Sequence, residues 1–170
     1  MKKIKTSQAL ALAAIFPAVL ALAACNTSEP AAEVSSSSAA GARDLHNEEA
    51  NRKLVVDFYN KFFNEHEPEE AAEVVADDYI QHNPSVPDGK EPFVSFFSGY
   101  FLENPESKAE IVRSSTDGDL VYLHVRSTDA SIDKETAVVD IFRVEDGKIL
   151  EHWDVIQDVP DESANLNTMF

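Results

Sequence analysis

The sequence has little of what several functional classes require. One of its 170 residues is cysteine, so the chain can form no internal disulfide and no multi-thiolate metal site. It has 14 Lys and Arg against 31 Asp and Glu, a net charge of −17, and such a surface repels nucleic acid and anionic lipid head groups. We find no phosphate loop, no Gly-rich dinucleotide turn and no basic aromatic surface. We therefore expect no nucleic-acid partner, no metal and no other cofactor.

The N-terminus has the pattern of an export signal. Lys2, Lys3 and Lys5 precede an almost wholly apolar stretch at 9–24, which is too short and Ala-rich for a spanning helix. It ends in Leu22-Ala23-Ala24-Cys25, which resembles the lipobox of bacterial lipoproteins and implies that Cys25 is lipidated before cleavage. The alternative is an ordinary secretory signal with a chance cysteine after it, which we disfavour because the single cysteine falls at the cleavage position.

Three parts of the chain follow from this interpretation. Residues 1–24 are the signal peptide, 25–43 a lipidated tether rich in Ser, Ala, Glu and Pro, and 44–170 one domain. Acyl chains on Cys25 would attach the protein to a membrane without a spanning helix. Asn26 follows the cysteine where inner-membrane lipoproteins often carry Asp. By resemblance to those sorting rules, we expect the periplasmic face of the outer membrane.

The domain begins with helical patterns and ends with strand patterns. Apolar residues at helical spacing predict a helix over 47–64, Pro68 opens a short second helix, and five aromatics from Phe93 to Phe101 mark a third. Tyr79–His82 is typical of a short strand. Four segments rich in Val, Ile and aromatics then predict strands at 108–116, 120–128, 136–144 and 148–157. The order predicts an α+β fold, with three helices on one face of a curved antiparallel sheet.

Three strings in the domain resemble a known family. Tyr79–Pro84, Asp119–Arg126 and Val139–Asp154 look like the SnoaL-like polyketide cyclase branch of the nuclear transport factor 2-like superfamily. The resemblance covers about 47–159 and implies a cone-shaped α+β fold with a pocket. A fold of this kind supports many activities, so the site has to carry the functional argument.

Hairpin geometry suggests which side chains share the pocket. With Asp146-Gly147 as a two-residue turn, Asp140 lies opposite Trp153 and on the same strand face as Phe142. With Asp117-Gly118 as the other turn, Tyr122 and His124 share a face. Matching the polar-aromatic faces of the two hairpins brings all of these residues to one concave surface.

The expected chemistry centres on Asp140 and His124. Asp140, buried beside aromatic side chains, could remove a proton next to a carbonyl group, and His124 could stabilise the resulting enolate. The resemblance implies the same places, since SnoaL-like cyclases use an acidic residue on the penultimate strand. The alternative is a buried ion pair that only stabilises the sheet. We expect Tyr79, His82, Tyr122, Phe142 and Trp153 to bind substrate.

The opposite face of the last hairpin is expected to be outside the pocket. The apolar residues of this face are Val139, Ile141, Leu150 and Ile156. They predict a homodimer contact. His152 and Asp154 are assigned to this face too. Two such ligands without a third make a weak metal site, so surface or interface packing is the favoured interpretation.

Two functions fit these patterns. The first is a cofactor-free acid/base enzyme that carries out aldol condensation, isomerisation or hydration of a small hydrophobic carbonyl compound. The second is a non-catalytic envelope lipoprotein that holds a small apolar ligand in the same pocket. They differ in whether Asp140 and His124 converge within hydrogen-bond reach of a common point in a closed cavity.

Lipidation of Cys25 is directly testable. Mass spectrometry of the protein extracted from membranes should find a lipid-modified peptide that begins at Cys25. A Cys25→Ser variant should lose the modification and be recovered in the soluble fraction. A soluble wild-type protein whose first residue lies elsewhere would contradict the lipobox interpretation.

Overall fold

A computed structural model describes residues 43–129 and 134–170. Cys25, the signal peptide and nearly all of the tether lie outside the described residues. In the described part, no helix is both long and apolar enough to cross a membrane. The helices are α1 (Leu45–Phe63), α2 (Pro68–Ala71), the 3₁₀ turn η1 (Ala72–Val74) and α3 (Lys90–Glu103). The strands are β1 (Val75–Gln81), β2 (Lys108–Asp117), β3 (Leu120–Asp129), β4 (Lys134–Glu145) and β5 (Lys148–Asp158).

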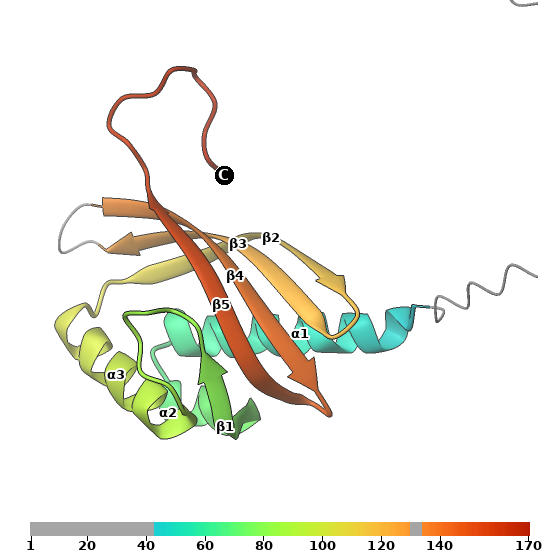
Figure 1. Ribbon diagram of the computed structural model, residues 1–170. Coiled ribbons are helices and arrows are strands. Elements are labelled where there is room, and N and C mark those ends of the chain that lie inside the picture. Colours follow the sequence, from blue (N-terminus) through green and yellow to red (C-terminus); the bar gives the residue numbers. More distant parts are fainter. Residues whose placement is uncertain (1–42, 130–133) are drawn as a thin grey trace, which may run out of the picture. The chain divides into compact units, whose positions relative to one another are not determined.

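The strands form one curved five-stranded sheet in the order β1-β5-β4-β3-β2 (Figure 1). The run from β2 to β5 is an antiparallel meander, as expected, and the α+β fold class is confirmed. The difference lies in β1, which pairs in parallel with β5 and makes the sheet mixed. Parallel neighbours need a long connection, and here α3 and three strands supply it.

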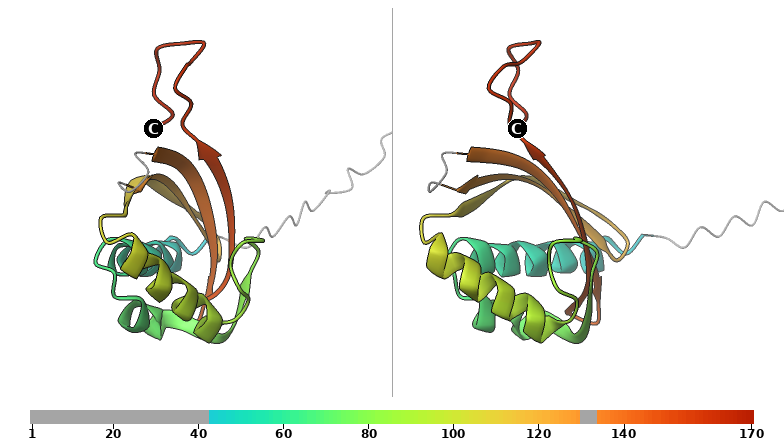
Figure 2. Two further views of the ribbon diagram at one scale, coloured as in Figure 1. Left: turned by 90° about the vertical axis from the view of Figure 1, so that its left-hand side faces the viewer. Right: turned by 60° about the vertical axis from the view of Figure 1, so that its left-hand side comes forward.

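The helices lie on the concave side of the sheet, as both views of Figure 2 show. Helix α1 buries one stripe of side chains against the sheet, and Val55 and Phe62 in this stripe are fully buried. Phe62 stacks on Phe93 of α3 with ring centroids 4.7 Å apart. The sheet contributes Val121, Leu123 and Val125 of β3, all fully buried. This core holds two helices at a defined distance from the concave face.

A β-bulge changes the expected register of the last hairpin. Next to the Asp146-Gly147 turn the pairs are as expected, with Val144 opposite Ile149. Both turn residues have positive φ, as a type I′ turn requires. Leu150 is then an extra residue on β5, and every later pair is displaced by one position.

The expected pairing of Asp140 with Trp153 is therefore wrong. Asp140 lies opposite Asp154, Phe142 lies opposite His152, and Trp153 lies opposite Ile141. Since side chains alternate along a strand, a one-residue displacement exchanges the two faces of β5 beyond the bulge.

The expected position of His124 on the concave face is also wrong. The turn between β2 and β3 consists of Gly118 and Asp119, one residue later than expected, with positive φ at Gly118 alone. More important is the pairing of β3 with β4, which sets Leu123 opposite Asp140 and His124 opposite Val139. The concave face takes the apolar side of β3, because burying that side against α1 removes more apolar surface from water.

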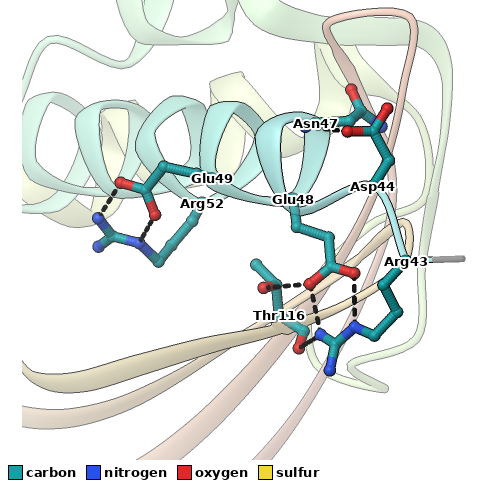
Figure 3. Close-up of polar contacts among 7 residues, drawn as sticks. All are labelled: Arg43, Asp44, Asn47, Glu48, Glu49, Arg52 and Thr116. Atoms are coloured by element: carbon teal, nitrogen blue, oxygen red, sulfur yellow. Dashed lines mark hydrogen bonds and ion pairs between the residues drawn. The ribbon is translucent and has the colours of Figure 1, made fainter.

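An ion pair between the exposed Arg43 and the buried Glu48 ties the start of α1 to the sheet (Figure 3). Glu48 is 4% exposed and accepts hydrogen bonds from the Arg43 guanidinium and from Thr116 Oγ1, the latter at 3.0 Å. Arg43 also donates to the Thr116 carbonyl at 3.0 Å. The hydrogen bond from Arg43, with a smaller contribution from Thr116, outweighs desolvation and lowers the pKa of Glu48 to about 2. The first turn of α1 is thereby fixed to the end of β2.

This ion pair predicts a pH-dependent stability. A carboxyl group with a folded pKa of about 2 and an ordinary value of 4.5 stabilises the fold above pH 4.5. That contribution is lost as the pH falls through the interval between the two values. Glu48→Gln should lower the melting temperature at pH 7, and its difference from wild type should shrink below pH 4.5.

Glu49 provides the control, because it sits one position along and pairs with Arg52 at the surface. Glu49→Gln should change the free energy of unfolding by less than about 0.5 kcal/mol. Equal losses in the two variants would show that the buried contact contributes nothing special. Thermal unfolding followed by circular dichroism between pH 2 and pH 7 measures both.

Candidate functional site

The concave face holds a cavity of about 210 Å³ between the sheet and the helices. Most of its wall is aromatic or aliphatic, and one end is polar. The apolar wall comprises Phe63, Val86, Phe93, Phe97, Tyr100, Ala109, Val138, Phe142 and Ile156. The polar end comprises Tyr59, Tyr79, Gln81, Asn83, Asp140, His152 and Asp154, and Ser127 is a separate polar residue of the wall. A largely apolar cavity with a few polar groups at one end has the character of a small-molecule site.

Asp140 lies at the centre of the polar end. It belongs to β4, is 4% exposed and accepts two hydrogen bonds from side chains. Tyr59 of α1 donates its hydroxyl proton to Asp140 Oδ2 at 2.8 Å. His152 Nε2 lies 2.9 Å from Asp140 Oδ1. Both carboxylate oxygens are therefore held in place, one by a helix and one by the neighbouring strand.

The surroundings of His152 determine how many protons it shares with Asp140. The backbone N–H of Asn83 donates to Gln81 Oε1 at 2.9 Å, which identifies that atom as the amide oxygen. His152 Nδ1 lies 2.9 Å from the same oxygen, so Nδ1 must carry a proton and donate it. Nε2 faces a carboxylate oxygen, and two lone pairs would repel each other there. A second proton must lie between His152 Nε2 and Asp140 Oδ1, and the pair has no net charge wherever that proton resides.

Asp154 is the third ionisable group of the polar end. It lies opposite Asp140 in the β4–β5 pairing and accepts a 2.6 Å hydrogen bond from Asn83 Nδ2 at its Oδ2. The amide of Asn83 is itself oriented by the backbone N–H of Ser85, which donates to Asn83 Oδ1. Among the described residues, no cationic side chain pairs with Asp154.

Two tyrosine hydroxyls complete the polar end. Burial, followed by the nearby charge of Asp140, raises the pKa of Tyr59 and of Tyr79 well above the ordinary value of 10. Both phenols therefore stay protonated at any physiological pH. Tyr59 is a permanent donor to Asp140, and the hydroxyl of Tyr79 accepts from Gln81 Nε2 at 3.2 Å.

The structure brings together some of the residues expected at the site and separates others. Asp140, Tyr79 and Phe142 line the cavity. Tyr122 and His124 project from the opposite face of the sheet, where Arg113 Nη1 lies 2.8 Å from His124 Nδ1. A partnership of His124 with Asp140 is therefore wrong.

Trp153 and His82 are also outside the cavity. Their rings stack on each other with centroids 4.7 Å apart, and His82 Nε2 lies 2.8 Å from a carboxylate oxygen of Glu151. The bulge at Leu150 accounts for Trp153. His82 follows Gln81 on an extended segment, so its side chain points away from the cavity that Gln81 lines.

His152, Asp154 and Tyr59 line the cavity but are not predicted as site residues from the sequence. His152 and Asp154 were assigned to the outer face, and only the bulge at Leu150 reverses that assignment. Tyr59 lies beside Phe58 and Phe62 in the buried stripe of α1, so nothing in the pattern separates it from core. A usable signal was present at Tyr79, Gln81 and Asn83, because their spacing of two puts three polar groups on one face.

Three ligand-type side chains meet at this point, so a metal ion has to be considered. Asp140, His152 and Asp154 each offer one atom, and these atoms lie within 4.8 Å of one another. The 2.9 Å contact between His152 Nε2 and Asp140 Oδ1 is shorter than the roughly 3.4 Å between two ligands of a tetrahedral zinc ion, given bonds of about 2.1 Å. The spacing is that of a proton-sharing pair beside a second carboxylate.

Several solved structures share the fold of this domain. A candidate ketosteroid isomerase from Kribbella flavida is 20% identical with a TM-score of 0.58, over 70% of this chain and 86% of that one. A candidate polyketide cyclase from Bacillus cereus is 23% identical with a TM-score of 0.55, over 63% and 74% of the two chains. IdmH, a candidate polyketide cyclase from Streptomyces antibioticus, is 20% identical with a TM-score of 0.52, over 62% and 91%. At these identities the likeness establishes the fold alone.

The family is established by sequence. Residues 55–152 match the model of the SnoaL-like domain, so the chain belongs to the SnoaL-like family. Among curated proteins, none matches this chain. The activity therefore has to be argued from the cavity and its polar end.

Proposed function

We propose that this domain is a cofactor-free acid/base enzyme acting on a small, largely apolar carbonyl compound. The observation that carries the proposal is the 2.9 Å contact between Asp140 Oδ1 and His152 Nε2 at one end of an apolar cavity. Aldol condensation, isomerisation and hydration all require a proton to be taken from one atom and delivered to another. A pair that offers an acceptor and a donor at one point can do both.

The geometry gives each residue a role. With the shared proton on His152, the Asp140 carboxylate accepts a proton from the carbon next to the carbonyl group. The imidazolium of His152 then supplies a proton to the enolate oxygen or to a second carbon. Tyr59 holds Asp140 through its Oδ2, and Gln81 holds His152 through its Nδ1, so both are positioning residues. Little reorganisation is needed when charge develops, because all these groups are already oriented.

The cavity also indicates the size of the substrate. Its volume of about 210 Å³ is below the range of roughly 300–1,000 Å³ typical of sites for drug-sized ligands. Phe93, Phe97 and Phe142 leave the wall without hydrogen-bonding groups over most of its area. A single-ring or short branched carbonyl compound fits this description.

Asp140→Asn tests the catalytic role. The new amide can donate to His152 Nε2 and accept from Tyr59, so the fold should be retained. Exchange of the α-protons of acetophenone, cyclohexanone and benzylacetone in heavy water, followed by NMR, should fall about a hundred- to ten-thousandfold. Ligand binding should change little, because the amide and carboxylate have the same shape.

Asp158→Asn is the matched control. Like Asp140→Asn, it replaces one carboxylate by an amide. Asp158, however, is exposed at the end of β5 and pairs with Lys134 outside the cavity. This variant should exchange protons at the wild-type rate. If the wild-type domain binds these ketones without exchanging their α-protons, the protein is a binding lipoprotein and not an enzyme.

We also propose that the enzyme works in the cell envelope. The support is the Leu22–Cys25 string and the Ser/Ala-rich segment after it, which together suit a lipid anchor and a tether. Asn26 favours the outer membrane over the inner one. This location depends on lipidation of Cys25, which the mass-spectrometric experiment tests.

A homodimer through the convex face of the sheet is part of the same proposal. Val139 is 41% exposed and Val155, its partner across β4 and β5, is 69% exposed. The C-terminal Phe170 covers Arg126 on that face, with its ring centroid 4.4 Å from Arg126 Cζ, and leaves the valines open. Ile156, assigned to this contact from the sequence, instead lines the cavity. The dimer contact would centre on Val139 and Val155.

Val155→Lys should therefore convert a dimer into a monomer in sedimentation velocity. The charge would be buried against a second copy, whereas in a monomer it would stay in water. Leu102→Lys is the control, since Leu102 is 85% exposed on α3 and lies off the sheet. A wild-type domain that sediments as a monomer at high concentration would contradict the proposal.

A further inference from the structure

The charges at the polar end of the cavity do not balance. Asp140 and His152 share one proton, so together they contribute no net charge to the polar end. Asp154 adds one negative charge, and among the described residues its one hydrogen-bond partner is the neutral amide of Asn83. Among the described residues that line the cavity, none is Lys or Arg. Asp154 is only partly buried, and a carboxylate that is partly withdrawn from water beside an apolar wall is stabilised by a cation next to it.

We propose that the cavity binds a small organic cation, a protonated amine carried on an apolar body, with its ammonium group on Asp154. The inference deepens the proposed function, and rests on it, by naming the substrate class of the same site. The second oxygen of Asp154 has no partner among the described residues and is free to accept from an ammonium group. A charge-assisted hydrogen bond of this kind is stronger than one between neutral groups.

The aromatic wall provides the rest of the recognition. Seven aromatic side chains line the cavity, and they are Tyr59, Phe63, Tyr79, Phe93, Phe97, Tyr100 and Phe142. The faces of aromatic rings attract cations and also accommodate the apolar part of a ligand. An apolar wall alone would accept any small hydrophobic molecule. The wall together with one uncompensated carboxylate selects an amine.

The same arrangement rejects anions. A carboxylate or phosphate on the ligand would meet Asp154 with no Lys or Arg beside it. Like charges at close range in a poorly solvated site repel strongly. Carboxylic acids and phosphate esters are therefore excluded as substrates.

Three ligands of nearly the same shape separate these possibilities. Benzylamine is cationic at neutral pH, benzyl alcohol is neutral and benzoate is anionic. Calorimetric titration of the full chain should show that benzylamine binds roughly tenfold or more tightly than benzyl alcohol. Benzoate should show no measurable binding. The preference of benzylamine over benzyl alcohol should weaken as salt is added, because Asp154 is only partly buried.

Asp154→Asn distinguishes this site from the general negative charge of the protein. The variant should bind benzylamine and benzyl alcohol with equal affinity, whereas Asp158→Asn should keep the wild-type preference. Equal affinities in the wild type, or a preference that survives in Asp154→Asn, would overturn the cation site. Either failure leaves the proton-exchange test of Asp140 unaffected, so the cation site and the acid/base activity fail separately.

Discussion

One extra residue in β5 determines the composition of the site. Leu150 has no partner on β4, and the strand beyond it is displaced by one position. His152 and Asp154 therefore face α1 and α3, and Trp153 faces away from them. Without this bulge, Asp140 would lie beside an indole and have no proton-sharing partner. A bulge next to a site is a common way to redirect side chains without changing the fold.

The polar end remains buried because almost every group in it has a partner. Tyr59 comes from α1, Gln81 from the edge strand β1 and Asn83 from the segment after it, and each one orients a different member of the cluster. A network of this kind stabilises the fold when it is complete and is costly when one partner is missing. Asp154 is the exception, because one of its oxygens has no partner among the described residues. The second carboxylate oxygen of Asp154 can therefore accept a hydrogen bond from a ligand in the cavity.

The same core that stabilises the domain also shapes the cavity. Phe62 and Phe93 stack between α1 and α3, and Phe93 continues into the cavity wall. At the other end of α1, Glu48 and Arg43 attach the helix to β2. Tyr59 is carried on this helix, so its distance to Asp140 depends on both contacts. Packing and ion pairing far from the polar end therefore control the geometry of the proton-sharing pair.

The sequence by itself determined the order of the elements, the fold class and the place of Asp140 and Tyr79 in the cavity. These follow from local patterns, because periodicity and turn residues act over a few positions. The tertiary structure alone decided that His152 and Asp154, and not His124 and Trp153, accompany Asp140. A bulge leaves no clear local signature at Leu150, and the pairing of β3 with β4 depends on which face buries more apolar surface against α1. Since a displacement of one residue exchanges the faces of a strand, that decision lies beyond what spacing along the chain can specify.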